Sequence, residues 1–172
     1  ARHITSTREE NVNVAESLLQ AGPVLGGVSL ELGENRIVER GDLALVSVAV
    51  PLGGEAALTR AFETLWQIAL PGPRRASVQG DLRAMWTAAD QIMLVFPHPT
   101  PDAAGMVAGK LDGAGYVTEQ TDGWVILEIS GPDTLAALER LCPLDLEATT
   151  FPAGSSARTQ CDHMGTMIHR QS

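Results

Sequence analysis

The sequence predicts an α+β fold in which a split βαβ (ferredoxin-like) unit builds a mixed sheet with helices on one face. The first observation is a valine-rich apolar run over residues 43–50, which is typical of a buried strand. The second is a pair of stretches, residues 58–69 and 103–111, whose apolar side chains recur at helical spacing. The third is the order of elements, strand, helix, strand, strand, helix and strand. Such units give an antiparallel or mixed sheet with one covered face.

The first half of this unit contains the strongest strand of the chain. Residues 43–50 are nearly continuous in apolar character, so this strand is expected at the centre of its sheet or buried on both faces. Proline and glycine at residues 51–54 end the strand, and a second such cluster at residues 71–73 closes the helix that follows. Trp66 lies beside the apolar stripe of that helix, which consists of Leu58, Phe62, Leu65 and Ala69.

The second half of the unit repeats the pattern. A short strand is expected over residues 74–79, and another strand or a hairpin over residues 81–96, for which residues 89–90 could form the turn. A second helix is predicted to begin with Thr100 as its cap and Pro101 at its first position. Ala103, Val107 and Leu111 share one face of this helix, and Gly113 or Gly115 is expected to end it. A strand over residues 116–120 is expected to follow.

A strand, a capped turn and a short helix are predicted over residues 121–146. A turn at residues 122–123 leads into residues 124–130, which alternate with the period of two of a half-buried strand. Residues 130–133 then supply a cap, a proline suited to the first helical position and a carboxylate near the positive end of the helix dipole. The helix is expected to end at Pro143, which cannot continue it.

The two ends of the chain give weaker signals. Residues 1–25 are expected to form an N-terminal arm, helix-like over residues 13–20, and residues 26–172 a single α+β domain. Residues 26–40 are predicted to be an edge strand followed by a loop. Residues 157–170 are predicted to form one last strand.

Composition excludes several classes of protein. The 172 residues are 44% hydrophobic and 19% charged, which is ordinary for a globular domain. The 21 acidic residues outnumber the 12 basic ones, and a net charge of −9 argues against binding to nucleic acid. No apolar run is long enough to span a membrane, and the first residues lack the apolar core of a secretion signal. The two cysteines suit free thiols in a reducing compartment, so the cytoplasm is expected.

Cys161 and His163 form the most suggestive local cluster. On one strand they would project from the same face, as a nucleophile with its base or as half of a metal site. A metal needs more ligands than this pair offers, and free cysteine commonly packs as a small apolar residue. A buried thiol beside a structural histidine is therefore the favoured interpretation. His98 and His169 are expected to be solvated or packed.

Other candidate sites have simpler structural explanations. Residues 109–115 are glycine-rich but follow a helix, whereas a dinucleotide loop follows a strand, so they are predicted to be a helix terminus. Gly131 is expected to permit a sharp turn. The aspartates at turn positions are expected to accept hydrogen bonds from nearby backbone amides; they are Asp42, Asp81, Asp90, Asp122 and Asp145. The tryptophans are expected to be core or interface residues; they are Trp66, Trp86 and Trp124. These residues assign no catalytic, cofactor-binding or metal-binding position.

Five segments carry a further signal as an ordered set. They are residues 86–96, 120–132, 138–146, 151–154 and 158–168, within a match that spans roughly residues 40–170. In this order they resemble the gamma subunit of heterotetrameric sarcosine oxidase, or the matching subunit of paralogous N-methyl amino acid dehydrogenases. The family continues with a further strand and helix beyond the region matching Ile168, so an incomplete last element is expected.

The resemblance implies a fold similar to the folate-binding part of the glycine-cleavage T-protein. It also implies a structural subunit with no cofactor of its own, assembled with alpha, beta and delta subunits. FAD, FMN, NAD, zinc and tetrahydrofolate are then expected on those other subunits. The complex would oxidatively demethylate sarcosine, or a related N-methyl amino acid, and pass the one-carbon unit to tetrahydrofolate. The alternatives are an independent T-protein-like folate-binding protein and an enzyme that uses Cys161 and His163.

Overall fold

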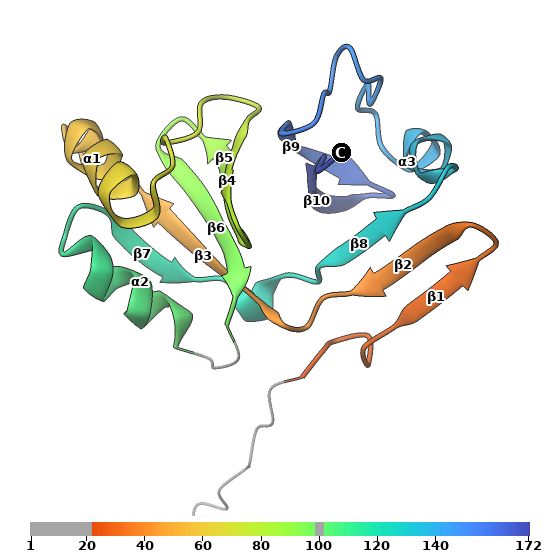
Figure 1. Ribbon diagram of the computed structural model, residues 1–172, viewed down its shortest axis with the longest axis horizontal. Coiled ribbons are helices and arrows are strands. Elements are labelled where there is room, and N and C mark those ends of the chain that lie inside the picture. The colour runs from red at the N-terminus through yellow and green to blue at the C-terminus, as the bar shows by residue number, and fades with distance from the viewer. Residues whose placement is uncertain (1–21, 99–101) are drawn as a thin grey trace, which may run out of the picture.

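The computed structural model describes residues 22–98 and 102–172, and Figure 1 shows how their elements are arranged. The predicted helix over residues 13–20 and the predicted helix start at Thr100 and Pro101 lie outside these residues. The described strands are β1 Ser29–Leu32, β2 Asn35–Glu39, β3 Leu43–Ala49, β4 Ala76–Gln79, β5 Leu82–Ala88, β6 Gln91–Pro97, β7 Tyr116–Glu119, β8 Leu127–Ser130, β9 Ser156–Cys161 and β10 Met164–His169. The described helices are α1 Glu55–Trp66, α2 Ala103–Leu111, α3 Thr134–Leu141 and the 3-10 helix η1 Thr121–Gly123.

Five strands form the central sheet in the order β4-β5-β6-β3-β7. Without the edge strand β4, the chain runs β3, α1, β5, β6, α2 and β7, which is the predicted split βαβ unit. Figure 1 shows α1 and α2 on the same face of this sheet. The α+β prediction is confirmed, but every pairing is antiparallel, so the sheet is not mixed. The reason is that the strands joined by each helix are separated by one strand running the opposite way.

The helix-covered face of the sheet holds the main core. β3 lies between β6 and β7, as its apolar sequence predicts, and its side chains Ala44, Val46 and Val48 point toward the helices. Phe62 of α1 is fully buried here. All three residues of the predicted α2 face are buried in the same core, namely Ala103, Val107 and Leu111.

The core-facing side of α1 differs slightly from the predicted stripe. The helix ends at Trp66, so Ala69 lies beyond it and is exposed, and Leu65 is 39% exposed. Trp66 takes over this part of the core, because its ring packs edge-on against Phe62 with ring centroids 4.8 Å apart. Gln67, in the left-handed conformation, ends the helix one turn earlier than the stripe suggested.

Two predictions at the ends of the domain are wrong. The expected loop after the edge strand contains β2, which pairs with β1 and β8 in a three-stranded antiparallel sheet. The single last strand expected over residues 157–170 is a hairpin of β9 and β10. It turns at Asp162 and His163, whose φ angles of 45° and 71° are left-handed. Asp and His tolerate this conformation better than most residues, but neither is as clear a turn signal as glycine.

The junction between β8 and α3 resembles the prediction but is shifted. The strand begins at Leu127, three residues later than expected, and Asp133 occupies the N-cap position of α3 without a capping hydrogen bond from its side chain. Gly131 has a φ of 120°, and a Cβ there would lie 2.6 Å from the backbone of Asn35. The Asn35 side chain accepts a bond from the Asp133 N–H (2.9 Å) and donates one to the Asp133 carboxylate (2.9 Å). A close approach to the β1–β2 turn therefore requires glycine here.

A smaller core joins α3 to the C-terminal hairpin. Its buried members are Cys142, Leu146, Phe151 and Ala157, with Leu135, Leu138, Leu144, Cys161 and Ile168 packed against them. This cluster lies on the side of the central sheet opposite α1 and α2 (Figure 1). No described helix is long and apolar enough to cross a membrane.

Candidate functional site

The candidate site lies on the second face of the central sheet, which the helices do not cover. Side chains alternate along each strand, so this face carries the residues between those of the main core. Toward one end the face is apolar, with Leu43, Leu45, Met85, Met93 and Val95. Toward the other end it becomes polar, with Ser47 of β3, Thr87 of β5 and Gln91 of β6. One strand face therefore offers both a packing surface and hydrogen-bonding groups.

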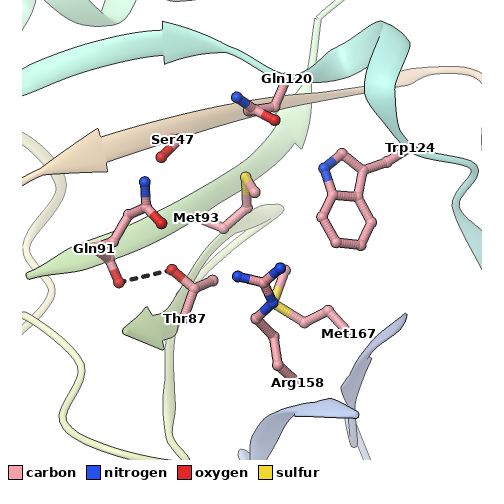
Figure 2. Close-up of a pocket in the computed structure, with 8 residues that line it drawn as sticks. All are labelled: Ser47, Thr87, Gln91, Met93, Gln120, Trp124, Arg158 and Met167. Atoms are coloured by element: carbon pink, nitrogen blue, oxygen red, sulfur yellow. Dashed lines mark hydrogen bonds between the residues drawn. The ribbon is translucent and has the colours of Figure 1, made fainter. Parts of the chain in front are cut away.

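A partial cover crosses this face and leaves two cavities. The segment after η1 contributes Trp124 and Ile126, and the C-terminal hairpin contributes Met167. The first cavity has a volume of about 110 Å³. Figure 2 shows Ser47, Thr87, Gln91 and Met93 from the sheet, Gln120 and Trp124 from the segment after β7, and Arg158 and Met167 from the hairpin.

The polar groups of the first cavity are amides, hydroxyls and one guanidinium. The Thr87 hydroxyl donates to the Gln91 carbonyl (2.8 Å), as Figure 2 marks with a dashed line. Arg158 reaches the cavity from an exposed position on β9, and its guanidinium has no ion-pair or hydrogen-bond partner among the described residues. The cavity can hold a small polar or anionic group beside the Trp124 ring. Among its described lining residues there is no carboxylate, histidine or cysteine to act as a base or nucleophile.

The second cavity, of about 150 Å³, lies at the apolar end of the same face. Arg40 occupies its rim and pairs with Glu128 (2.7 Å) and, through two nitrogens, with Asp42 (both 2.8 Å). The hydrogen bonds to Asp42 and Glu128 raise the pKa of Arg40, and the bond from Arg40 lowers the pKa of Asp42. Two carboxylates therefore hold the guanidinium of Arg40 in place at this rim.

His169 also lines the second cavity. Its Nδ1 donates to the Ser155 carbonyl (3.0 Å), which agrees with the expectation of a packed histidine. Burial lowers the pKa of His169, and the nearby charge of Arg83 lowers it further, while the bond to Ser155 acts in the opposite direction. At neutral pH this histidine is an uncharged, structural group that joins the end of β10 to the residue before β9.

The predicted Cys161–His163 cluster does not form. His163 lies exposed in the turn after β9, so the two residues do not share one strand face. The interpretation of Cys161 as a packed thiol is supported, since it contacts the smaller core beside Cys142. The paired histidine is instead His98, whose Nε2 lies 2.9 Å from the Asp102 carboxylate.

The other predicted candidates have structural roles. The five turn aspartates lie exposed in separate turns, and among these described residues no acid–base pair is brought together. Asp145 accepts the backbone N–H of Glu147 (3.1 Å), as expected of a turn aspartate. The glycine-rich residues 109–115 are the end of α2. Trp66 and Trp86 pack on the main core, whereas Trp124 covers the cavities.

Sequence reasoning missed the residues that line the first cavity. Arg158 and Met167 are cross-strand partners in the β9–β10 register, so they extend from the same face of the hairpin. Because one continuous strand was predicted over residues 157–170, this pairing was not expected. Gln91 and Gln120 carried no signal, since isolated amides are common on exposed strands.

Two of the three comparisons with known proteins found similar proteins. No family model matches the sequence. The chain is 31% identical over 126 residues to "Sarcosine oxidase subunit gamma" of Corynebacterium sp. (strain P-1), an alignment that covers 71% of this chain and 60% of that protein. The predicted resemblance to this gamma subunit is confirmed. The chain thus spans about 60% of the length of the curated relative that it matches.

A solved structure shows that the fold is shared. A chain of the heterotetrameric sarcosine oxidase from Corynebacterium sp. U-96, determined in complex with pyrrole 2-carboxylate, superposes with a TM-score of 0.67 at 21% identity. The superposition covers 82% of this chain and 73% of that one. At this identity the likeness describes the α+β fold, and the function is inferred from the sequence similarity.

Proposed function

We propose that the chain is the non-catalytic gamma-type subunit of a heterotetrameric, sarcosine oxidase-type flavoenzyme complex. The observation that carries the proposal is the 31% identity to a sarcosine oxidase gamma subunit. In this assignment the alpha, beta and delta subunits are its partners, and they hold FAD, FMN, NAD, zinc and tetrahydrofolate. The complex oxidatively demethylates sarcosine or a related N-methyl amino acid and transfers the one-carbon unit to tetrahydrofolate.

The two cavities favour a folate site on another subunit over an independent one on this chain. Their volumes, about 110 and 150 Å³, are below the several hundred Å³ typical of pockets for ligands the size of a folate. The carboxylate that lines the second cavity, Glu128, is already bound to Arg40 at 2.7 Å. A pterin would have to compete with that ion pair for its acidic partner.

An exposed apolar sheet face supports the subunit role. Leu30 of β1 is in register with Ile37 of β2, which is in register with Ile129 of β8, so the three side chains form a row across the three-stranded sheet. Leu32 and Leu127 extend this row and are 59% and 44% exposed. A contiguous apolar row on a small acidic chain is typical of a protein–protein contact. In the proposed complex this face packs against a neighbouring subunit.

Co-purification from the natural host tests the proposal. A tagged copy of this chain is expected to bring three further subunits and a yellow flavin spectrum, and the double variant Leu30→Asp, Leu127→Asp is expected to lose them. Leu52→Asp is the matched control, because Leu52 is fully exposed in a turn away from that sheet. A colourless monomer whose Trp124 fluorescence is quenched by added tetrahydrofolate would overturn the proposal and favour an independent folate-binding protein.

A further inference from the structure

We propose that Cys142 and Cys161 are a redox modification site, where a hydroperoxide converts the two thiols into a reversible disulfide. The proposal does not depend on the subunit role, because it uses only contacts within this chain. Cys142 is the residue directly after α3, and Cys161 is the last residue of β9. They are the only two cysteines of the sequence.

The backbone holds the two cysteines side by side. The N–H of Asp162 donates to the carbonyl of Leu141 at 3.0 Å, so the residue next to each cysteine takes part in one inter-segment hydrogen bond. Both thiols belong to the apolar cluster between α3 and the hairpin. The two backbone segments therefore run next to each other at the cysteines, and a disulfide requires such proximity.

The two thiols have different environments, which assigns them different roles. Cys142 is 5% exposed and its Sγ donates to the Leu138 carbonyl at 3.1 Å. Burial raises the pKa of the Cys142 thiol, and the neighbouring Cys161 thiol raises it further against an opposing bond from Leu144. Cys161 is only half-buried and is followed by the exposed Asp162–His163 turn. Peroxide therefore meets Cys161 first, and Cys142 is the resolving thiol.

The reaction is balanced with the hydroperoxide as its only oxidant. The Cys161 thiolate attacks the terminal peroxide oxygen, the O–O bond breaks, and the alkoxide or hydroxide leaves with a proton as an alcohol or water. The Cys142 sulfur then attacks the resulting sulfenic acid, the S–O bond breaks, and the hydroxide leaves with the remaining thiol proton as one molecule of water. Two electrons pass from the thiol pair to the peroxide, and one S–S bond forms.

The disulfide would tie the loop between α3 and β9 to the hairpin that covers the cavities. Closing a loop of this length removes entropy from the unfolded chain, so oxidation is expected to raise the midpoint of thermal unfolding by about 5 °C. A thiol reductant should reverse this shift.

Peroxide treatment followed by alkylation tests the proposal on the full chain. The wild type is expected to lose both maleimide-reactive thiols together, while its intact mass falls by two hydrogen atoms. In Cys142→Ala, Cys161 is expected to stop at a sulfenic acid that dimedone traps. In Cys161→Ala, the buried Cys142 is expected to stay reduced at the same peroxide dose.

Three results would overturn the proposal. One is a wild type that retains both free thiols, and another is a wild type that forms only disulfides between separate chains. The third is a wild type in which dimedone traps as much sulfenic acid as in Cys142→Ala. Circular dichroism of each reduced variant shows whether it is folded, and the wild-type mass measurement decides the question if either variant is not.

Discussion

The two faces of the central sheet are built by the same strands and behave differently. Along β3, Val46 and Val48 are fully buried under α1 and α2, whereas Ser47 between them faces the second side and borders a cavity. Helices of nine and twelve residues cover the first face with continuous apolar stripes. The second face is crossed by an irregular segment and a hairpin, which contact it through Trp124, Ile126 and Met167.

This difference shows what decides whether a sheet face becomes a core or a site. A helix supplies an apolar side chain at every turn and packs to the density of a crystal, so no room is left for polar groups. A hairpin supplies one apolar residue in two and leaves gaps beside the sheet. Polar residues such as Thr87 and Gln91 are tolerated in these gaps, where they satisfy each other or meet solvent.

The largest expected effect is on the helix-covered face. Phe62→Ala removes a fully buried ring that packs edge-on against Trp66, so it should lower the free energy of unfolding by about 3–5 kcal/mol. Met93→Ala, on the second face beside the first cavity, should cost about 2 kcal/mol, because part of its surroundings is already open. Urea unfolding measures both. Equal losses would mean that the two faces are packed equally well.

Two substitutions on β3, each of which enlarges a side chain, test the same difference in packing between the two faces of the sheet. Ala44→Leu adds volume to the dense face and should destabilise by about 1–3 kcal/mol, since its neighbours cannot move aside. Ser47→Leu adds a similar volume toward the first cavity and should change the free energy of unfolding by less than about 1 kcal/mol. The same urea titration compares them. A larger loss at Ser47 than at Ala44 would show that the cavity is not available to a side chain.

The sequence predicted the central unit well, because its signals are local. The apolar run of β3 and the stripe Ala103, Val107 and Leu111 depend only on spacing along the chain. β2 was missed because Asn35, Arg36 and Glu39 give it the composition of a loop, and only pairing with β1 and β8 makes it a strand.

The candidate site was not predictable for a related reason. Its lining comes from strands and loops far apart in the sequence, and none of these residues belongs to a motif. Arg158 and Met167 meet only because the chain reverses at Asp162 and His163. The contact between Cys142 and Cys161 likewise depends on how α3 packs against the hairpin. Local periodicity predicts the elements, whereas their packing determines the site.

A further small effect concerns a carboxylate that links the layers on both faces. Glu119, at the end of β7, accepts the N–H of Ala104 at the start of α2 (2.8 Å) and the hydroxyl of Thr121. The Thr121 oxygen in turn accepts the N–H of Leu45 (3.0 Å), next to the segment that covers the second face. Burial by itself would raise the pKa of Glu119, but these hydrogen bonds outweigh it and lower the pKa below its usual 4.5.

A lowered pKa in the folded state makes the contribution of Glu119 depend on pH. The stabilisation is complete above the unfolded-state pKa and is lost as the pH falls through the folded-state pKa. Glu119→Gln should therefore lower the free energy of unfolding by about 1 kcal/mol at pH 7, a small effect because solvent reaches the carboxylate. Glu63→Gln, at an exposed position of α1, controls for the change in net charge.

Urea titrations at a series of pH values separate this role from a general charge effect. The difference between wild type and Glu119→Gln should shrink below pH 4.5, as the wild-type carboxylate takes up its proton, while Glu63→Gln should follow the wild type throughout. A difference that stays constant down to pH 3 would mean that the glutamine disturbs packing. The two layers would then be held together by packing alone. The charge on Glu119 would not contribute to holding α2 and the segment that covers the cavities to the same strand.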